Sequence, residues 1–219
     1  MSKNFKKYLI LAFLFFFPIF VYVFLSTGIN NFAKLPILTD RVTDIKNIDG
    51  NELKVSFKDK ISIVAFWGGD IKNKKSEALN LNQKIYKRFF EFQDFQFVVI
   101  HNKSESQEIE SLKAELISGV GTDLKKWNFI PTTQANIKIV FDSFRTNLEL
   151  DENYSTPYVF IVDRDMSLRG RDDDEDMGML YGFNSQSVAE INNKMVDDVK
   201  IILAEYRLAL KKNDSLFNE

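Results

Sequence analysis

The chain contains no cysteine and only one histidine among its 219 residues. Without thiols, disulfide bonds, thiol catalysis, zinc–thiolate sites and lipid attachment through cysteine are excluded. The single histidine, His101, excludes a multi-histidine metal site within one chain. The net charge of −2 gives no general attraction to nucleic acid, so no nucleic-acid partner is predicted.

A long apolar run near the N-terminus is the strongest signal of protein class. Lysines precede the run Tyr8 to Leu25, which would be about 27 Å long as a helix and so match a bilayer's hydrocarbon core. It is longer than most secretory signal cores, and no small-x-small cleavage site closes it. Pro18 is tolerated in a membrane helix. We therefore predict a single transmembrane anchor, residues 1–28, with a cytoplasmic N-terminus and an extracytoplasmic, periplasm-like domain. A cleaved signal and a buried helix are the alternatives.

The rest of the chain is long enough for one domain with a substantial core. Hydrophobic residues make up 45% of the sequence and include 21 Phe, which predicts an aromatic-rich core. We assign residues 29–36 to a linker, 37–212 to the domain and 213–219 to a flexible tail.

Hydrophobic periodicity predicts alternating strands and helices. Continuous apolar, β-branched runs predict buried strands at 61–66, 95–100 and 157–163, and the alternation of Leu53, Val55 and Phe57 predicts a half-exposed strand. Helical spacing marks 76–90 and 106–117, the second ended by Gly119 and Gly121. Residues 167–171 and 178–181 predict a hairpin, and Ser187 with Glu190 a capping box before the last helix. Residues 128–150 show no clear pattern. The expected fold class is α/β, a central mixed sheet flanked by helices.

The order of these segments resembles thioredoxin-like proteins, and specifically the SCO/SenC group of membrane-anchored copper chaperones for cytochrome oxidase. The resemblance covers most of residues 35–210. Each matching segment alone is a weak indicator of the family, but their order along the chain is a stronger one. The segments are Val64–Trp67, Phe97–Ile100, Trp127–Phe129, Tyr158–Asp163, Leu168–Gly170 and the last helix. The resemblance implies a thioredoxin-like fold and a site at the corner Trp67-Gly68-Gly69-Asp70.

The departures from the family pattern concern every expected copper ligand. Aligned without gaps from Phe66, the family's CxxxC pair falls near Ile71 and Lys75, and its copper-binding histidine near Ser155. None of these side chains is a ligand for a soft metal, which prefers thiolate, thioether or imidazole. Thr156–Pro157 resembles the family's cis-proline corner. We therefore predict no catalytic, cofactor or metal site, and regard Trp67, Gly68, Gly69, Asp70, Ile71, Lys75, Ser155 and Pro157 as positions of docking interest.

Other candidate sites have simpler interpretations. His101 is expected at a strand end, where a catalytic base would lack a partner. The run Asp172–Asp176 predicts a solvated hairpin tip, with protein docking or a hard cation such as calcium as alternatives. Gly68-Gly69 predicts a tight turn rather than a phosphate loop. Three lysines at a predicted helix start oppose the helix dipole, which indicates either a binding partner or sequence drift: Lys72, Lys74 and Lys75. Three methionines could either pack in the core or loops or act as thioether ligands for copper: Met177, Met179 and Met195.

Together these features predict a membrane-anchored, SCO-like protein without redox or copper ligands. We expect an interaction or assembly role at the cell envelope, with a protein partner. Respiratory-complex assembly is the setting that the family resemblance implies. The alternative is a copper metallochaperone for cytochrome oxidase assembly that uses non-standard ligands. An enzyme such as a thiol-independent hydrolase or peroxidase is not expected, and a deep polar pocket around Asp70 and Ser155 would revive it.

Overall fold

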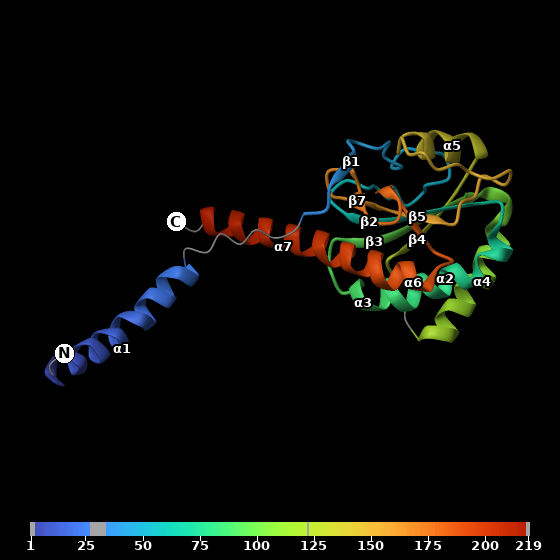
Figure 1. Cartoon of the computed structure of the whole chain (residues 1–219). Coiled ribbons are helices and arrows are strands. Elements are labelled where there is room, and N and C mark those ends of the chain that lie inside the picture. The colour runs from blue at the N-terminus through green and yellow to red at the C-terminus, as the bar shows by residue number, and fades with distance from the viewer. Residues whose placement is uncertain (1–2, 27–33, 122, 218–219) are drawn as a thin grey trace. The chain divides into compact units, whose positions relative to one another are not determined.

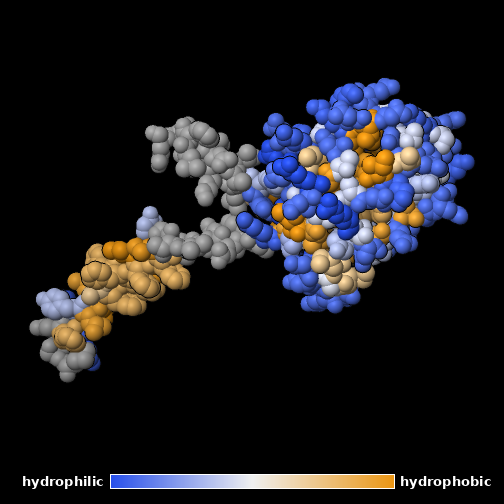
Figure 2. Space-filling model, turned by 90° about the horizontal axis from the view of Figure 1, so that it is seen from above, coloured by the Kyte–Doolittle hydropathy of each residue, from blue (hydrophilic) through white to orange (hydrophobic). Residues whose placement is uncertain are grey.

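The computed structural model describes residues 3–26, 34–121 and 123–217, which fall into two units. The first contains helix α1, Lys3–Ser26. Its segment Phe5–Phe24 is long and apolar enough to cross a membrane, as the sequence predicts. The side chains described there are solvent-exposed or partly so, and Figure 2 shows an apolar surface along the helix. The second unit begins at Lys34 and contains every other element (Figure 1).

The second unit is built on a mixed sheet in the order β1-β6-β5-β2-β3-β4, with β9 paired to β5. The parallel strands β2, β3 and β4 span Ile61–Gly68, Phe95–Asn102 and Trp127–Thr132, and β5, Tyr158–Val162, runs antiparallel to β2. The short strands β1, β6 and β9 cover Ile37–Thr39, Leu168–Arg169 and Phe183–Asn184. The hairpin predicted from 167–171 and 178–181 is only partly correct, because Leu168–Arg169 form β6 and pair with β1 and β5 of the main sheet. The second strand pairs instead with β7: a separate two-stranded sheet joins β7, Arg171–Asp174, to β8, Gly178–Leu180.

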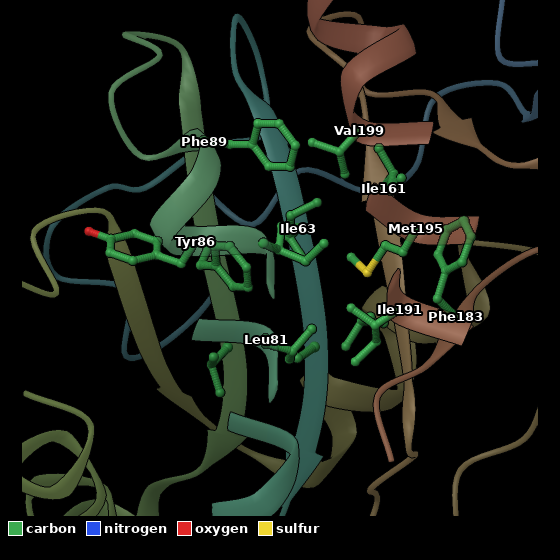
Figure 3. Packing of buried hydrophobic residues seen from close by; sticks show 14 of the residues in the cluster. Ile63, Leu81, Tyr86, Phe89, Ile161, Phe183, Ile191, Met195 and Val199 are labelled. Atoms are coloured by element: carbon green, nitrogen blue, oxygen red, sulfur yellow. The ribbon is translucent and has the colours of Figure 1, made fainter. Parts of the chain in front are cut away.

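Helices cover both faces of the sheet. The first helical segment comprises α2, Lys75–Leu81, a π-helical turn, and α3, Lys87–Phe89. On the same face lie α4, Ser106–Val120, and the C-terminal segment of α6, Val188–Glu190, a second π-helical turn, and α7, Val196–Phe217. Figure 3 shows Leu81, Tyr86 and Phe89 on one side of Ile63, and Ile191, Met195 and Val199 on the other.

The opposite face carries a second core cluster. Strand side chains alternate between faces, so Val64 and Phe66 point away from Ile63 and Trp67 and pack in this second cluster. Helix α5, Gln134–Asp142, covers them, and the ring of Phe66 meets that of Phe141 edge-on at 5.2 Å. Strand β2 therefore has both faces buried, which explains its largely apolar sequence; Ser62 is its one polar side chain.

Two regions differ from the sequence predictions. The alternating segment at 53–57 is not a strand: Lys54 has a left-handed φ of 53°, and Phe57 is buried while Asp44 accepts its N–H at 2.9 Å. Residues 128–150, which gave no pattern, contain most of β4 and all of α5. The hydroxyl oxygen of Thr133 caps α5 by accepting the N–H of Asn136.

Several predicted boundaries also shift. Gly121, left-handed at φ 68°, ends α4, whereas Gly119 lies inside it. Only half of the capping box forms, because Glu190 Oε1 accepts the N–H of Asn184 instead of that of Ser187. Leu35, in the predicted linker, is buried in the core, and α7 continues to Phe217, into the predicted tail.

Candidate functional site: the corner after strand β2

The corner Trp67–Asp70 is closed by a loop from elsewhere in the chain. Gly68 has a φ of +50°, and a Cβ built on it would lie 2.1 Å from the carbonyl oxygen of Asn153. The next amide, Gly69 N–H, donates to the same oxygen at 2.8 Å. We call residues 151–156 the clamp loop. At its end, the N–H of Thr156 donates to Phe66 O at 3.0 Å. Gly68 is therefore required by close backbone approach, and the turn interpretation of Gly68-Gly69 is the one its geometry fits.

The clamp loop is held in shape by its own aspartate. Asp151 Oδ1 accepts the N–H groups of Asn153 and Ser155, each at 2.9 Å, and Asp151 N–H donates to Ser155 O. Ser155, at the family's histidine position, is 1% exposed, and its hydroxyl has no hydrogen-bond partner among the described residues. A partner molecule approaching from solvent therefore cannot reach this side chain without movement of the loop.

The two positions that correspond to the CxxxC pair have separate environments. Ile71 begins a 3₁₀ turn, Ile71–Asn73, and is 2% exposed in the core. Lys75, one helical turn later, is exposed, and its Nζ lies 2.9 Å from Glu115 Oε2 of α4. Beside them is a hollow of about 390 Å³ with a floor of Ile71 and Leu112. One position is thus filled by a hydrocarbon and the other by a surface ion pair.

A buried ion pair at the start of α2 was not predicted from the sequence. Lys74 Nζ lies 3.0 Å from Glu77 Oε1, and the two side chains are 4% and 3% exposed. Glu77 also accepts from Gln186 Nε2 at 3.0 Å and from the hydroxyl of Ser185 at 2.9 Å. Lys74 is therefore not one of three lysines displayed to a partner. Only the i,i+3 spacing of Lys74 and Glu77 could have signalled the pair.

Pro157 belongs to the same polar cluster. Its carbonyl oxygen accepts the hydroxyl of Ser185 at 2.6 Å and the N–H of Ser185 at 2.9 Å. The described residues contain no cis peptide bond, so the expected cis corner at Thr156–Pro157 is wrong. Extended pairing of Tyr158 and Val159 with β9 fixes the chain after Pro157 without that isomer.

The two indoles pack below the corner. Trp67 is fully buried, with its ring centroid 6.2 Å from that of Trp127 and 6.4 Å from that of Phe129. Neither indole N–H has a hydrogen-bond partner among the described residues. Of the corner residues, Gly69 and Asp70 keep partial exposure, and Lys72, Asn73 and Lys75 beyond them are exposed. This exposed strip is the part of the corner that another protein can contact.

His101 lies beside the corner, on the neighbouring strand. It pairs in register with Gly68 of β2 and Pro131 of β4, and it is 2% exposed. Its Nδ1 lies 2.9 Å from Asn102 O. Burial lowers the pKa of His101, and the positive charge of Lys113 lowers it further. The strand-end position is confirmed, although the side chain is in the interior.

The acidic run is only partly a solvated tip. Asp172, Asp173, Glu175 and Asp176 are exposed, but Asp174 is buried and bonds Lys194 Nζ at 2.7 Å. Burial raises the pKa of Asp174, but hydrogen bonds from Lys194 and two backbone amides outweigh it, so the pKa lies below its usual value. The described residues hold no cluster of three or more histidine or carboxylate groups suited to a metal ion.

The three methionines considered as copper ligands do not lie at one site. Met195 is fully buried in the core (Figure 3), whereas Met177 and Met179 are exposed on the β7–β8 hairpin. No site combines all three thioethers, and the packing interpretation holds for Met195.

Comparison with known proteins gives matches in structure alone. No family model and no curated protein matches the sequence. Among solved structures, BsSco, a Sco-family cytochrome c oxidase assembly protein described with a disulfide switch, matches 78% of this chain and 98% of its own at 11% identity, with a TM-score of 0.50. The domain has a thioredoxin-like fold. The solved structures similar to it include Sco/SenC family proteins and thioredoxin-like oxidoreductases.

Two further solved structures match the chain with similar coverage. An Sco/SenC family lipoprotein from Bacillus anthracis strain Ames covers 80% of this chain and 99% of its own at 15% identity, with a TM-score of 0.46. The thioredoxin domain of a thiol-disulfide oxidoreductase from Bacteroides vulgatus has the same coverages at 17% identity and a TM-score of 0.43. This chain has the fold, but it has no cysteine.

Proposed function

We propose that this chain is a membrane-anchored thioredoxin-fold protein that acts by binding another protein, in an interaction or assembly role at the cell envelope. The domain would be extracytoplasmic, with α1 as the anchor. The observation that carries the proposal is the replacement of a dithiol corner by a closed one. The clamp loop lies on Gly68, and the buried pair Lys74–Glu77 occupies the start of α2. The chain has the strand-to-helix corner but no thiol.

A closed corner favours surface recognition over chemistry. Buried ion pairs contribute little net stability, but their removal one partner at a time is costly, so they specify one arrangement. Here that arrangement fixes α2 against residues 185–186 and presents Asp70, Lys72 and Lys75 on a rigid frame. Rigid surfaces bind partners with a smaller loss of conformational entropy. Respiratory-complex assembly is the context that the Sco resemblance suggests for this partner.

Site-specific photo-crosslinking tests the docking role. A photoreactive residue at Lys72 in the full-length membrane protein is expected to capture one discrete protein, and capture should fall when Asp70→Ala is added. The same residue at Lys138, on the far face in α5, is the matched control. Equal capture at both positions, or none at Lys72, would argue against docking at the corner.

A copper metallochaperone with non-standard ligands is the second candidate. The observation that favours it is the pair of exposed thioethers two residues apart, with Met177 59% and Met179 41% exposed. Thioethers bind copper(I). Met177→Leu with Met179→Leu would abolish copper(I) binding if this candidate is correct and change nothing if it is not.

A further inference from the structure

A large hollow in the domain lies at the opposite end of the sheet from the corner. It has a volume of about 690 Å³ and is open to solvent. It is lined by residues that belong to β1 or follow it, precede β2, join β5 to β6 and belong to α7. Among them are Ile37, Asp40, Arg41, Lys58, Asp59 and Tyr206. Strand β2 separates the two ends by about 23 Å. We call this cavity the amino-end hollow.

The backbone around the amino-end hollow is unusual. Arg41, Asp59 and Met166 all line it and have left-handed φ values of 48°, 61° and 66°. The conformation is uncommon for residues other than glycine and costs about 1 kcal/mol or more each. Hydrogen bonds hold it, since Val42 N–H donates to Met166 O and Asp59 N–H to Arg164 O. Strained backbone persists where the surroundings impose it, and it gathers at binding sites.

The floor of the hollow is a satisfied charge cluster. The buried Arg169 guanidinium donates to Asp163 Oδ2 at 2.9 Å, to Glu205 Oε2 at 2.7 Å and to the carbonyl oxygen of Leu35. Burial opposes the charge of Arg169, but its carboxylate partners outweigh this effect and raise its pKa. The charges of the floor are therefore already paired, and a ligand would be bound by the side chains of the rim.

The rim carries charges of both signs without internal partners. Asp40 and Asp59 are exposed carboxylates, and Arg41 and Lys58 are exposed cations. None of the four makes an ion pair with the residues described in 3–26, 34–121 and 123–217. A ligand with a cationic and an anionic group could bond both pairs at once, whereas a simple anion or cation would meet like charge.

The hollow is also the part of the domain closest along the chain to the anchor. Helix α1 ends at Ser26 and the domain begins at Lys34, so seven residues separate them in the sequence. Leu35 is bonded to the floor through Arg169, and Ile37 lines the hollow with 55% of its surface exposed. An exposed apolar residue next to charged groups suits a surface that meets lipid.

We propose that the amino-end hollow binds the headgroup of a phospholipid that carries a primary ammonium, seating the domain on the membrane that holds α1. The phosphate lies on Arg41 and Lys58, and the ammonium donates hydrogen bonds to Asp40 and Asp59. A quaternary ammonium has no N–H to donate, and an anionic glycerol headgroup has no cation. The inference rests on the anchoring part of the proposed function and is independent of docking at the corner.

The test uses the full chain in lipid nanodiscs. Because the chain has no cysteine, a single Thr43→Cys donor label can report energy transfer to acceptor lipids, with Lys72→Cys as the label at the far end. Transfer from Thr43 should be at least about twofold higher in discs with phosphatidylethanolamine than in discs of phosphatidylcholine alone or with phosphatidylglycerol. Soluble glycerophosphoethanolamine should reduce it, and glycerophosphocholine should not.

Charge variants connect the effect to the rim. Asp40→Asn with Asp59→Asn, or Arg41→Asn with Lys58→Gln, should abolish the lipid preference; asparagine tolerates the left-handed φ at 41 and 59. Asp142→Asn in α5 is the matched control and should keep it. Circular dichroism establishes that each variant is folded.

Equal transfer in all three lipids, or a preference that survives both rim variants, would overturn the inference. Failure of the chain to insert into discs would instead refute the anchor. Crosslinking from Lys72 reports docking separately, so these failures are distinguishable.

Discussion

The ammonium of Lys74 lies 3.0 Å from the carboxylate of Glu77, and both side chains are almost completely shielded from solvent. Ser185 and Gln186 hydrogen-bond the same carboxylate. The pair lies where the 3₁₀ turn Ile71–Asn73 leads into α2. It holds α2 against residues 185–186 and so gives the corner a fixed shape.

Glu77→Gln should destabilise the domain by about 3 kcal/mol or more, because it leaves the buried Lys74 ammonium without a counter-charge. The double variant Lys74→Met with Glu77→Gln should recover most of this loss, since no buried charge remains. Urea unfolding of the full chain in detergent measures both. The exposed pair Lys75–Glu115 is the control, and breaking it should cost less than about 1 kcal/mol. A double variant no more stable than Glu77→Gln would contradict the role given to the pair.

Gly68→Ala should disrupt the contact between the corner and the clamp loop. The new Cβ would lie 2.1 Å from Asn153 O and 2.4 Å from Tyr154 O, so backbone must move. Gly178→Ala is a matched control with a similar φ of +69° and no atom within 4 Å; it should cost only the left-handed strain, about 1 kcal/mol. Amide exchange at Asn153 to Ser155 should accelerate in the first variant alone. Equal destabilisation by both would show that the contact is unimportant.

His101 predicts a pH dependence of stability. Burial lowers its pKa in the folded state below 6.5, so the unfolded chain binds the proton more readily. The stability contributed by neutral His101 is fully present above pH 6.5. It is lost as the pH falls from 6.5 toward the pKa of His101 in the folded state, by at most about 1.4 kcal/mol per pH unit.

His101→Gln should remove this component. The difference in unfolding free energy between the native chain and the variant should shrink between about pH 7.5 and about pH 5. Because the chain has one histidine, a proton NMR titration observes the group directly. A folded-state pKa at or above 6.5 would contradict the prediction.

The acidic hairpin predicts unequal effects within one run of carboxylates. Asp174→Asn should cost about 1–3 kcal/mol, because Asp174 is buried and bonds Lys194 and the amides of Asp176 and Met177. Asp173→Asn, exposed next to it, should change stability by less than about 0.5 kcal/mol. Thermal unfolding compares them. Equal effects would restore the fully solvated tip that the sequence suggests.

The central strands were predictable because their environment is simple. Strands β2, β3 and β5 are buried on both faces, so their sequences are mostly apolar and stand out from the helices. The thioredoxin-like order followed from them. The signal for α5 was also present, since Ile137, Val140 and Phe141 repeat at helical spacing after the cap Thr133, but the short β4 before it obscured the pattern.

The candidate site was less predictable because its contacts join distant segments. Glu77 meets Ser185 and Gln186, and Gly68 meets Asn153; no local pattern encodes either contact. Lys74 between Lys72 and Lys75 has the appearance of a solvated charge, and only tertiary packing buries it. The strand predicted at 53–57 is wrong for the same reason, because Phe57 is buried by a turn in which its N–H donates to Asp44.

The most direct test of the central claim is a copper(I) titration of the purified full-length protein against a chromophoric competitor. A corner without thiol or imidazole ligands predicts no stoichiometric binding, and the Met177→Leu, Met179→Leu variant should behave like the native chain. Binding of one copper(I) per chain at sub-micromolar affinity would contradict the account.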